Sequence, residues 1–367
     1  MNVVFAPDSF KGTMGAANVA AALAEGWLWE RPEDKAVLLP MADGGEGTMA
    51  AFAAAVPGAE RVAVRVTGPD GSPVDSAWLR LPPTPDLPSG TAIIELGATS
   101  GIELLERLRP LEAHTVGLGQ AIAAALTAGV SRIVVGLGSS ASTDGGAGLL
   151  QALGARFLNA GGADVPPGGA GLSAIATVDL TGLVSLPPGG VVALTDVTNP
   201  LLGAAGSAAV FGPQKGADPG QVAQLDTGLA HFADLVDADP STPGAGAAGG
   251  AGFGLLAWGA TLQPGSSTVG ELIGLPNAGA QADIIVTGEG SYDGQSAAGK
   301  VPAYVASLAG AGTSVLLVAG RIAPDAELSA FASFMSLTDL AGSAEHAMAD
   351  TGRWLRAAGA QLARGVV

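Results

Sequence analysis

The sequence predicts an α/β fold in two parts: a discontinuous parallel-sheet domain and a second α/β domain inserted into it. Three observations predict this layout. Strand-like apolar runs alternate with helix-like runs at both ends of the chain, which is typical of parallel sheets. The middle of the chain instead begins with antiparallel strands. The length of 367 residues suits about two domains.

The N-terminal section alternates strand and helix. Within its first helix Val19, Leu23 and Trp27 recur every four residues, which places them on one buried face. A strand–helix–strand–helix order indicates parallel strands with right-handed crossovers. The four predicted elements are Asn2–Ala6 (strand), Ala16–Arg31 (helix), Ala36–Leu39 (strand) and Met49–Ala55 (helix).

The same alternation returns near the C-terminus. The predicted strands are Asp283–Thr287, Ser314–Ala319 and Phe331–Leu337, and the predicted helices are Val301–Ala309 and Ser343–Arg364. Two strands from the start and three from the end would complete one five-stranded, flavodoxin-like sheet. We therefore predict that residues 1–57 and 281–367 form one domain and that residues 58–280 form the inserted domain.

The inserted section begins with two strands, Arg61–Thr67 and Ser76–Leu81, around the turn Pro69-Asp70-Gly71. Its further predicted strands are Ala92–Leu96, Arg132–Leu137 and Val191–Thr195, and its helices are Val116–Ala128 and Gly220–Val236. Apolar residues follow the glycine-rich stretch Gly244–Gly254 directly. This order favours a tightly packed helix start over a flexible linker.

Composition excludes several classes of function. The net charge of −17 disfavours binding to nucleic acid or to an anionic membrane. The absence of cysteine excludes disulfides, thiolate metal sites and cysteine nucleophiles. The three histidines, His114, His231 and His346, are too isolated for a zinc site. The apolar runs are too short to span a bilayer, and the start lacks a signal-peptide pattern, so we expect a cytoplasmic protein.

The stretch PMADGGEGTMAAF, Pro40–Phe52, combines two carboxylates, Asp43 and Glu46, with Gly44, Gly45 and Gly47. Glycine lets the backbone approach a ligand closely. Acidic residues in such a turn suggest a divalent cation or a proton-handling role. The alternative is an ordinary turn whose acidic residues cap the following helix.

A second polar loop follows the first strand and contains Asp8, Ser9 and Lys11. Ligands of open α/β sheets bind at the carboxyl ends of the strands, where this loop would lie. Lys11 suits a carboxylate or a phosphate group. A capped turn is the alternative. Since the first two strands are predicted neighbours, this loop and Pro40–Phe52 should lie side by side.

A third loop contains Gly138, Ser139 and Ser140, and Asp144-Gly145-Gly146 then opens a helix. Backbone N–H groups and serine hydroxyls of this kind cradle phosphates. No Gly-Lys-Ser/Thr follows, so it is no Walker A loop, and the acidic residue of a dinucleotide fingerprint is absent.

Three more loops carry charged residues after strands or between glycines. They contain Asp196; Lys215; and Glu289, Asp293 and Lys300. A Ser-His-Asp catalytic triad is disfavoured, because the sequence lacks the nucleophile-elbow motif that usually accompanies it. Glycines and lysines for phosphates, with carboxylates for Mg²⁺ and a substrate hydroxyl, suit phosphoryl transfer.

Taken together and in order, these loops resemble those of the bacterial type of glycerate kinase over nearly the full length. The matching motifs are APDSFKG, PMADGGEGT, DGGAGLLQALG, DVTNPLLG, FGPQKGA, GAGAAGG and TGEGSYDGQSAAGK. The resemblance implies ATP- and Mg²⁺-dependent phosphorylation of D-glycerate, with 2-phosphoglycerate the favoured product. It also implies a flavodoxin-like domain plus a second α/β domain, with the active site in the cleft between them.

On this resemblance we assign roles to the loop residues. The predicted catalytic residues are Asp196, Asp43, Lys11 and Asp293, with Asp196 favoured as the base. The predicted substrate-binding residues are Asp8, Ser9, Lys11, Gly44, Gly45, Lys215 and Glu289. The predicted nucleotide-binding residues are Gly138, Ser139, Ser140, Asp144, Gly145, Gly146 and Lys300. The predicted magnesium ligands are Asp43, Glu46 and Asp196.

The chain departs from the family pattern at a few positions. Ser139 and Thr143 stand where a glycine and an asparagine are usual, Gly15 where a helix-opening serine is usual, and Ser291 where an arginine is frequent. A kinase for another small hydroxy acid, a dehydrogenase and a non-catalytic binding relative are the alternatives. The missing dinucleotide fingerprint argues against the dehydrogenase. We expect a monomer or homodimer with a small-molecule substrate and no nucleic-acid or membrane partner.

Overall fold

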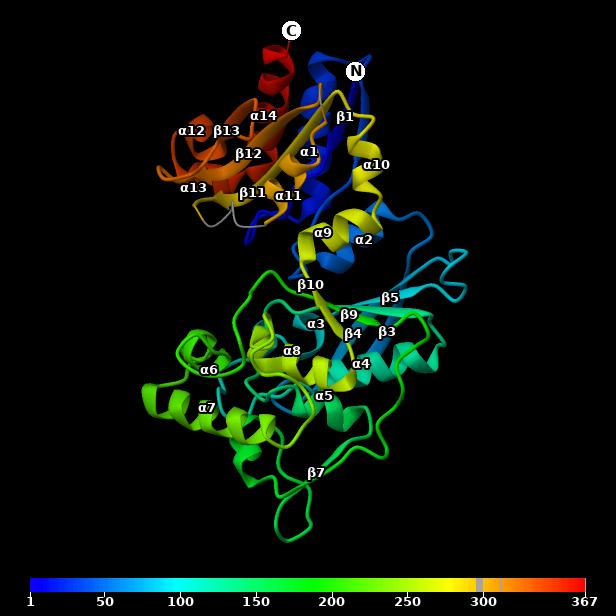
Figure 1. Cartoon of the computed structure of the whole chain (residues 1–367). Coiled ribbons are helices and arrows are strands. Elements are labelled where there is room, and N and C mark those ends of the chain that lie inside the picture. Colours follow the sequence, from blue (N-terminus) through cyan, green and yellow to red (C-terminus); the bar gives the residue numbers. More distant parts are fainter. Residues whose placement is uncertain (295–299, 311, 367) are drawn as a thin grey trace. The chain divides into compact units, whose positions relative to one another are not determined.

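The computed structural model describes residues 1–294, 300–310 and 312–366 (Figure 1). The chain divides into two compact units. The first contains Met1–Asp43, Ala50–Pro57 and Pro264–Val367, and the second contains Gly44–Met49 and Gly58–Gln263. The division differs from the predicted boundaries at two places, because Gly44–Met49 belongs to the second unit and residues 264–280 belong to the first.

The first unit is built on a five-stranded parallel sheet in the order β13-β12-β11-β1-β2. Its strands are β1 (Asn2–Phe5), β2 (Lys35–Leu38), β11 (Ile284–Tyr292), β12 (Ser314–Ile322) and β13 (Ser333–Ser336). The prediction that two early and three late strands share one sheet is confirmed. The order is that of flavodoxin-like sheets, in which the chain switches direction beside the first strand.

The helices of this unit are α1 (Ala16–Glu30), most of α2 (Thr48–Ala55), α9 (Gly265–Leu272), α10 (Leu275–Gly279), α11 (Val301–Ser307), α12 (Leu337–Ala341), α13 (Ala344–Ala349) and α14 (Thr351–Gly365). The first and last of them pack closely because Gly26 lies against the backbone of Arg356. Between β1 and α1, the rings of Phe5 and Trp27 meet edge to face, with 6.1 Å between their centroids.

The single closing helix predicted over Ser343–Arg364 is two helices. Asp350 separates α13 from α14 with an extended φ of −145°. Its carboxylate accepts a hydrogen bond from the Arg353 N–H at 3.2 Å and so caps α14. An N-cap needs non-helical backbone, which is why the helix breaks there.

The second unit contains a six-stranded sheet in the order β10-β9-β6-β5-β4-β3. Its strands are β3 (Glu60–Thr67), β4 (Pro73–Leu81), β5 (Thr91–Glu95), β6 (Arg132–Gly136), β9 (Val191–Leu194) and β10 (Thr261–Gln263). The first three pair antiparallel, as predicted, and the others run parallel. The antiparallel pair of β7 (Arg156–Leu158) with β8 (Thr177–Asp179) and strand β10 were not predicted, because three residues carry too little periodicity.

The α-helices of the second unit are α3 (Gly97–Ser100), α4 (Val116–Thr127), α5 (Ala147–Ala152), α6 (Ser207–Phe211), α7 (Pro219–Ala233) and α8 (Ala247–Trp258). Near the start of α8, Ala248, Gly249 and Gly250 have left-handed φ angles, and regular helix follows. The glycines are buried against the loop before α5, so the predicted packed helix start is confirmed.

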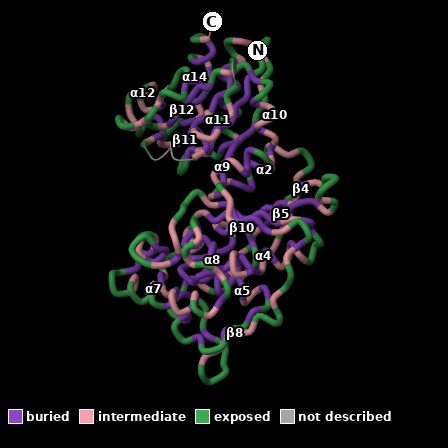
Figure 2. The backbone as a smooth tube through the Cα atoms, viewed as in Figure 1, coloured by how far each residue is buried: buried purple, intermediate pink, exposed green. Residues whose placement is uncertain are grey.

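In each unit the buried residues lie mainly on the strands of the sheet and on the helices that pack against them (Figure 2). Edge strand β2 differs, with no fully buried residue. Across the three described segments of the chain, every helix is too short or too polar to cross a membrane.

Candidate functional site

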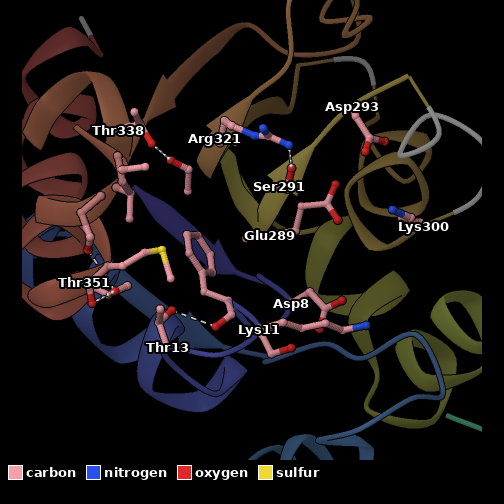
Figure 3. A pocket seen from close by; sticks show the side chains of 18 of the residues that line it. Asp8, Lys11, Thr13, Glu289, Ser291, Asp293, Lys300, Arg321, Thr338 and Thr351 are labelled. Carbon is pink, nitrogen blue, oxygen red and sulfur yellow. Dashed lines mark hydrogen bonds between the residues drawn. The ribbon is translucent and has the colours of Figure 1, made fainter. Parts of the chain in front are cut away.

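A pocket of about 520 Å³ lies in the first unit, at the carboxyl ends of β1, β11 and β12 (Figure 3). Strands β1 and β11 are neighbours in the sheet, and the chain leaves them toward opposite edges. Such a switch point is where open α/β sheets bind their ligands. The pocket therefore lies where the fold itself predicts a ligand.

Asp8 is the buried carboxylate of the loop that follows β1. Its N–H donates to the Gly288 carbonyl at 2.8 Å, which ties the loop to β11. Its Oδ1 accepts the Ser9 N–H at 2.6 Å. Burial, followed by the negative charge of Asp43, raises the pKa of Asp8 from 3.8 to about 8. The nearby Lys11 lowers the pKa of Asp8 only in part. This carboxyl group can therefore gain or lose a proton near neutral pH.

Three cations line the same pocket: Lys11, Lys300 and Arg321. Arg321 lies opposite Ser291 in the register of β12 with β11, and its Nη2 donates to the Ser291 Oγ at 3.3 Å. Among residues 1–294, 300–310 and 312–366, no ion pair neutralises any of the three. The pocket thus offers positive charge to an anionic ligand.

Carboxylates accompany these cations. Asp43, Glu289 and Asp293 line the pocket with Asp8, and Glu289 is buried. In Figure 3, Glu289 lies on β11 and Asp293 lies on the loop that follows this strand. Paired carboxylates and cations of this kind can handle a proton and hold anionic groups in one place.

The predicted nucleotide loop lies in the second unit and is mostly interior. Asp144 is fully buried, and its Oδ2 accepts from the N–H and the Oγ1 of Thr115, both at 2.8 Å, and from the Gly148 N–H at 3.2 Å. Its Oδ1 accepts the Gly146 N–H at 3.2 Å. The carboxylate therefore ties this loop to the start of α4.

Lys215 is also interior, only 2% exposed. Its Nζ donates to the Ser140 Oγ at 2.7 Å and to the Ser142 carbonyl at 2.5 Å. Burial lowers the pKa of Lys215 from 10.5 to about 7, although the charge of Asp144 opposes this shift. Through these two bonds Lys215 holds the loop of residues 138–146, named the glycine-hydroxyl loop below, from the interior of the unit.

Two glycine-containing segments of the second unit, residues 44–47 and 136–138, approach each other closely at the backbone. Gly44 has a φ of +85°, and a Cβ there would lie 2.6 Å from the Cβ of Leu194. A Cβ on Gly136 would lie 2.6 Å from the Gly44 carbonyl oxygen. The exposed polar residues beside this contact are Glu46, Ser139 and Asp196. Ser139 has a φ of +57°, a strained conformation outside glycine that is common at binding sites.

The structure thus separates the predicted site residues into two groups. The first unit brings together Asp8, Ser9, Lys11, Asp43, Glu289, Asp293 and Lys300 around one pocket. The second unit contains Gly44, Gly45, Glu46, Gly138, Ser139, Ser140, Asp144, Gly145, Gly146, Asp196 and Lys215. Their individual roles stay predictions, and residues 295–299 of the predicted Thr287–Lys300 loop lie outside the described residues.

Two charged residues at strand ends, Arg321 and Glu95, were not predicted as site residues from the sequence. Arg321 follows the apolar run of β12, so the rule that selected the other strand-end residues could have found it. Glu95, at the end of β5, is buried and accepts the Met49 N–H at 2.6 Å. Burial raises the pKa of Glu95. No local pattern distinguishes it from an ordinary strand residue.

Comparisons with known proteins agree along the whole chain. The sequence model described as "Glycerate kinase family" matches residues 3–367. Glycerate 2-kinase of Escherichia coli (strain K12) is 41% identical over 321 residues, which cover 84% of this chain and 82% of that protein. Glycerate kinase of Bacillus subtilis (strain 168) is 40% identical, with 89% and 86% covered. A crystal structure described as a glycerate kinase 2 from Salmonella typhimurium LT2 superposes with a TM-score of 0.84 at 38% identity, covering 100% of this chain and 99% of that one.

Proposed function

This chain belongs to the glycerate kinase family, and from that premise we propose that it transfers the γ-phosphoryl group of ATP to a hydroxyl of D-glycerate. The observation that carries the proposal is the pocket at the switch point. It combines a buried carboxyl group of near-neutral pKa with three cations. The relative named glycerate 2-kinase favours 2-phosphoglycerate as the product.

We assign the role of proton acceptor to the carboxylate of Asp8. The substrate hydroxyl oxygen forms a bond to the γ-phosphorus, the bond from that phosphorus to the bridging oxygen breaks, and ADP leaves. The hydroxyl proton passes to Asp8. A base works best when its pKa lies near the working pH, and burial has moved the pKa of Asp8 to about 8. Asp196, favoured from the sequence, is exposed in the second unit and remains the competing candidate.

The cations account for the charge of the substrates. Glycerate and ATP are both anionic, whereas the chain carries a net charge of −17. Lys11, Lys300 and Arg321 supply cations to a pocket that the carboxylates of Asp8, Asp43, Glu289 and Asp293 also line. Positioned cations bind anionic groups and stabilise the charge that spreads over a transferring phosphoryl group.

The donor set also fits Mg²⁺, which prefers carboxylate oxygens. Of the predicted metal ligands, Asp43 lines the pocket, while Glu46 and Asp196 belong to the second unit. No cluster of three or more metal-binding side chains occurs in the part of the chain that the structure describes. Mg²⁺ in kinases takes most of its ligands from phosphates and water, so one or two carboxylates suffice. When bound, it would neutralise charge on the phosphates.

The nucleotide assignment follows from the sequence motif. We propose that half-buried Gly138 and exposed Ser139 of this loop contact ATP phosphates through backbone N–H groups. Buried Asp144 and Lys215 would act by holding that loop in shape. A cytoplasmic location suits an enzyme that consumes ATP.

The test is ³¹P NMR of the purified protein with D-glycerate, Mg²⁺ and ATP. A new phosphomonoester signal that matches authentic 2-phosphoglycerate would support the proposal and its regiochemistry, and a match to 3-phosphoglycerate would correct the position. A folded protein that leaves ATP intact would contradict it. Repeating the experiment with other small hydroxy acids would then separate an altered substrate from a non-catalytic binding protein.

A further inference from the structure

We propose that Arg321 binds the carboxylate of the hydroxy-acid substrate and thereby selects acids over uncharged alcohols. This inference rests on the proposed function, because it names a specificity-determining contact of the same pocket. The starting observation is that Arg321 projects from β12 over Ser291 on β11 into the pocket (Figure 3).

The backbone around Arg321 is firmly placed. The preceding Gly320 lies tightly against the backbone of Gly290 on the neighbouring strand. The Thr338 Oγ1 donates to the Gly320 carbonyl at 2.8 Å. Eight register pairs hold β12 against β11, and one of them is Ser291 with Arg321. The guanidinium therefore starts from a rigid strand end, which is the condition for precise recognition.

The side chain is oriented but not neutralised. One guanidinium nitrogen donates to the Ser291 Oγ at 3.3 Å. Within the described residues no carboxylate forms an ion pair with Arg321. Serine is small enough to let the arginine lie across β11, and its hydroxyl occupies only one of five N–H donors. The remaining donors are available to a ligand.

A carboxylate is the best match for this group. The planar guanidinium presents two parallel N–H donors at the spacing of carboxylate oxygens, which a lysine ammonium cannot do. Glycerate is short, so a hydroxyl close to Asp8 brings its carboxylate to a cation of the same pocket. Lys11 and Lys300, the other two cations of the pocket, carry ammonium groups that lack these paired donors. Arg321 is therefore the cation best suited to the substrate carboxylate.

A cation also lies beside Ser291, the position at which the family resemblance implies an arginine. Arg321 is paired with Ser291 in the register of β12 with β11 and supplies positive charge at that place on the pocket wall.

The test compares Arg321→Gln, Arg321→Lys and Ser291→Ala with the matched control Arg65→Gln, an exposed arginine on β3. Calorimetric titration with D-glycerate alone and steady-state kinetics with ATP are both measured. For Arg321→Gln we expect the Kd and KM for glycerate to rise about 10- to 100-fold, the value of a charged hydrogen-bonded pair. The KM for ATP should stay within about twofold, since it reports a different contact.

Further expected results sharpen the test. Arg321→Lys should recover part of the loss, because it keeps the charge without the paired donors. The preference for glycerate over glycerol should fall by the same factor in Arg321→Gln, since glycerol never used the contact. Ser291→Ala should raise the KM for glycerate by about threefold, the value of one hydrogen bond. Arg65→Gln should match the wild type.

The outcomes separate the two proposals. An active wild type whose Arg321→Gln variant keeps its KM for glycerate, or raises the KM for ATP instead, overturns the carboxylate contact alone. A wild type that binds glycerate through Arg321 but forms no product overturns the proposed function alone. A wild type that binds no small hydroxy acid in calorimetry overturns both.

Discussion

The pocket of the first unit and the glycine-hydroxyl loop of the second use the same residue types in opposite ways. Both contain aspartate, lysine and serine or threonine side chains. In the first unit Lys11 and Arg321 reach a pocket without an ion pair among the described residues. In the second unit Asp144 and Lys215 are buried and bonded to the fold. Residue type alone therefore does not distinguish a ligand contact from an internal support.

The largest effect expected from this contrast concerns Asp8. We expect Asp8→Asn to lower kcat by about 10²- to 10⁴-fold, the usual value of a general base, without loss of thermal stability. Steady-state kinetics and a thermal melt measure both. Asp196→Asn is the matched variant. A large loss in Asp196→Asn with little change in Asp8→Asn would move the base to the second unit.

The next prediction concerns Asp144, the buried carboxylate of the second unit. Asp144→Ala leaves the buried N–H groups of Thr115, Gly146 and Gly148 without their acceptor. Each such group costs about 1–3 kcal/mol, so the free energy of unfolding should fall by at least about 3 kcal/mol. Urea unfolding measures it, with exposed Asp86→Ala as the control. Unchanged stability combined with a raised KM for ATP would instead make Asp144 a nucleotide contact.

The pH dependence of stability should differ in sign between the two regions. Folded Asp8 has a raised pKa of about 8, so the folded state holds more protons than the unfolded state between about pH 4 and 8. Stability should therefore fall as the pH rises through that window. Folded Lys215 has a lowered pKa of about 7 against 10.5, so its contribution should increase from pH 7 to 10.5.

Melting temperatures across the pH range would show both slopes. Asp8→Asn should remove the decline below pH 8, and Lys215→Met should remove the rise above pH 7. Each variant serves as the control for the other. If either slope survived its own substitution, the corresponding group would not be the one that titrates.

The smallest expected effect is at Ser139. Left-handed backbone costs a side chain roughly 1–2 kcal/mol, and glycine avoids that cost. We expect Ser139→Gly to raise the free energy of unfolding by about 1 kcal/mol, less the greater chain entropy of glycine. Urea unfolding would detect it, and Ala248→Gly, with a φ of +53°, should change in the same direction. A stability loss in Ser139→Gly would show that its side chain makes contacts worth more than the strain.

Much of the first unit could be predicted from the sequence. Apolar runs locate its five strands, and the rule that ligands bind at strand ends selects Asp8, Lys11 and Glu289. The interior state of Lys215 could not be predicted, because its hydrogen-bond partner Ser140 is 75 residues away. The same holds for Asp144 and Thr115, 29 residues apart. Burial of a polar group depends on packing between distant segments, which local patterns do not carry.

The discontinuous first unit has a consequence for synthesis. Strands β1 and β2 leave the ribosome first, yet β1 pairs with β11, and the hydrogen bond from the Thr287 Oγ1 to the Ala6 carbonyl spans 281 residues. The second unit is complete at Gln263 and can fold while the two early strands still await their partners. The pocket that we assign to glycerate is thus the last part of the nascent chain to form. Slowed translation within the last third of the message should prolong the exposure of Val3 and Phe5 and so favour aggregation.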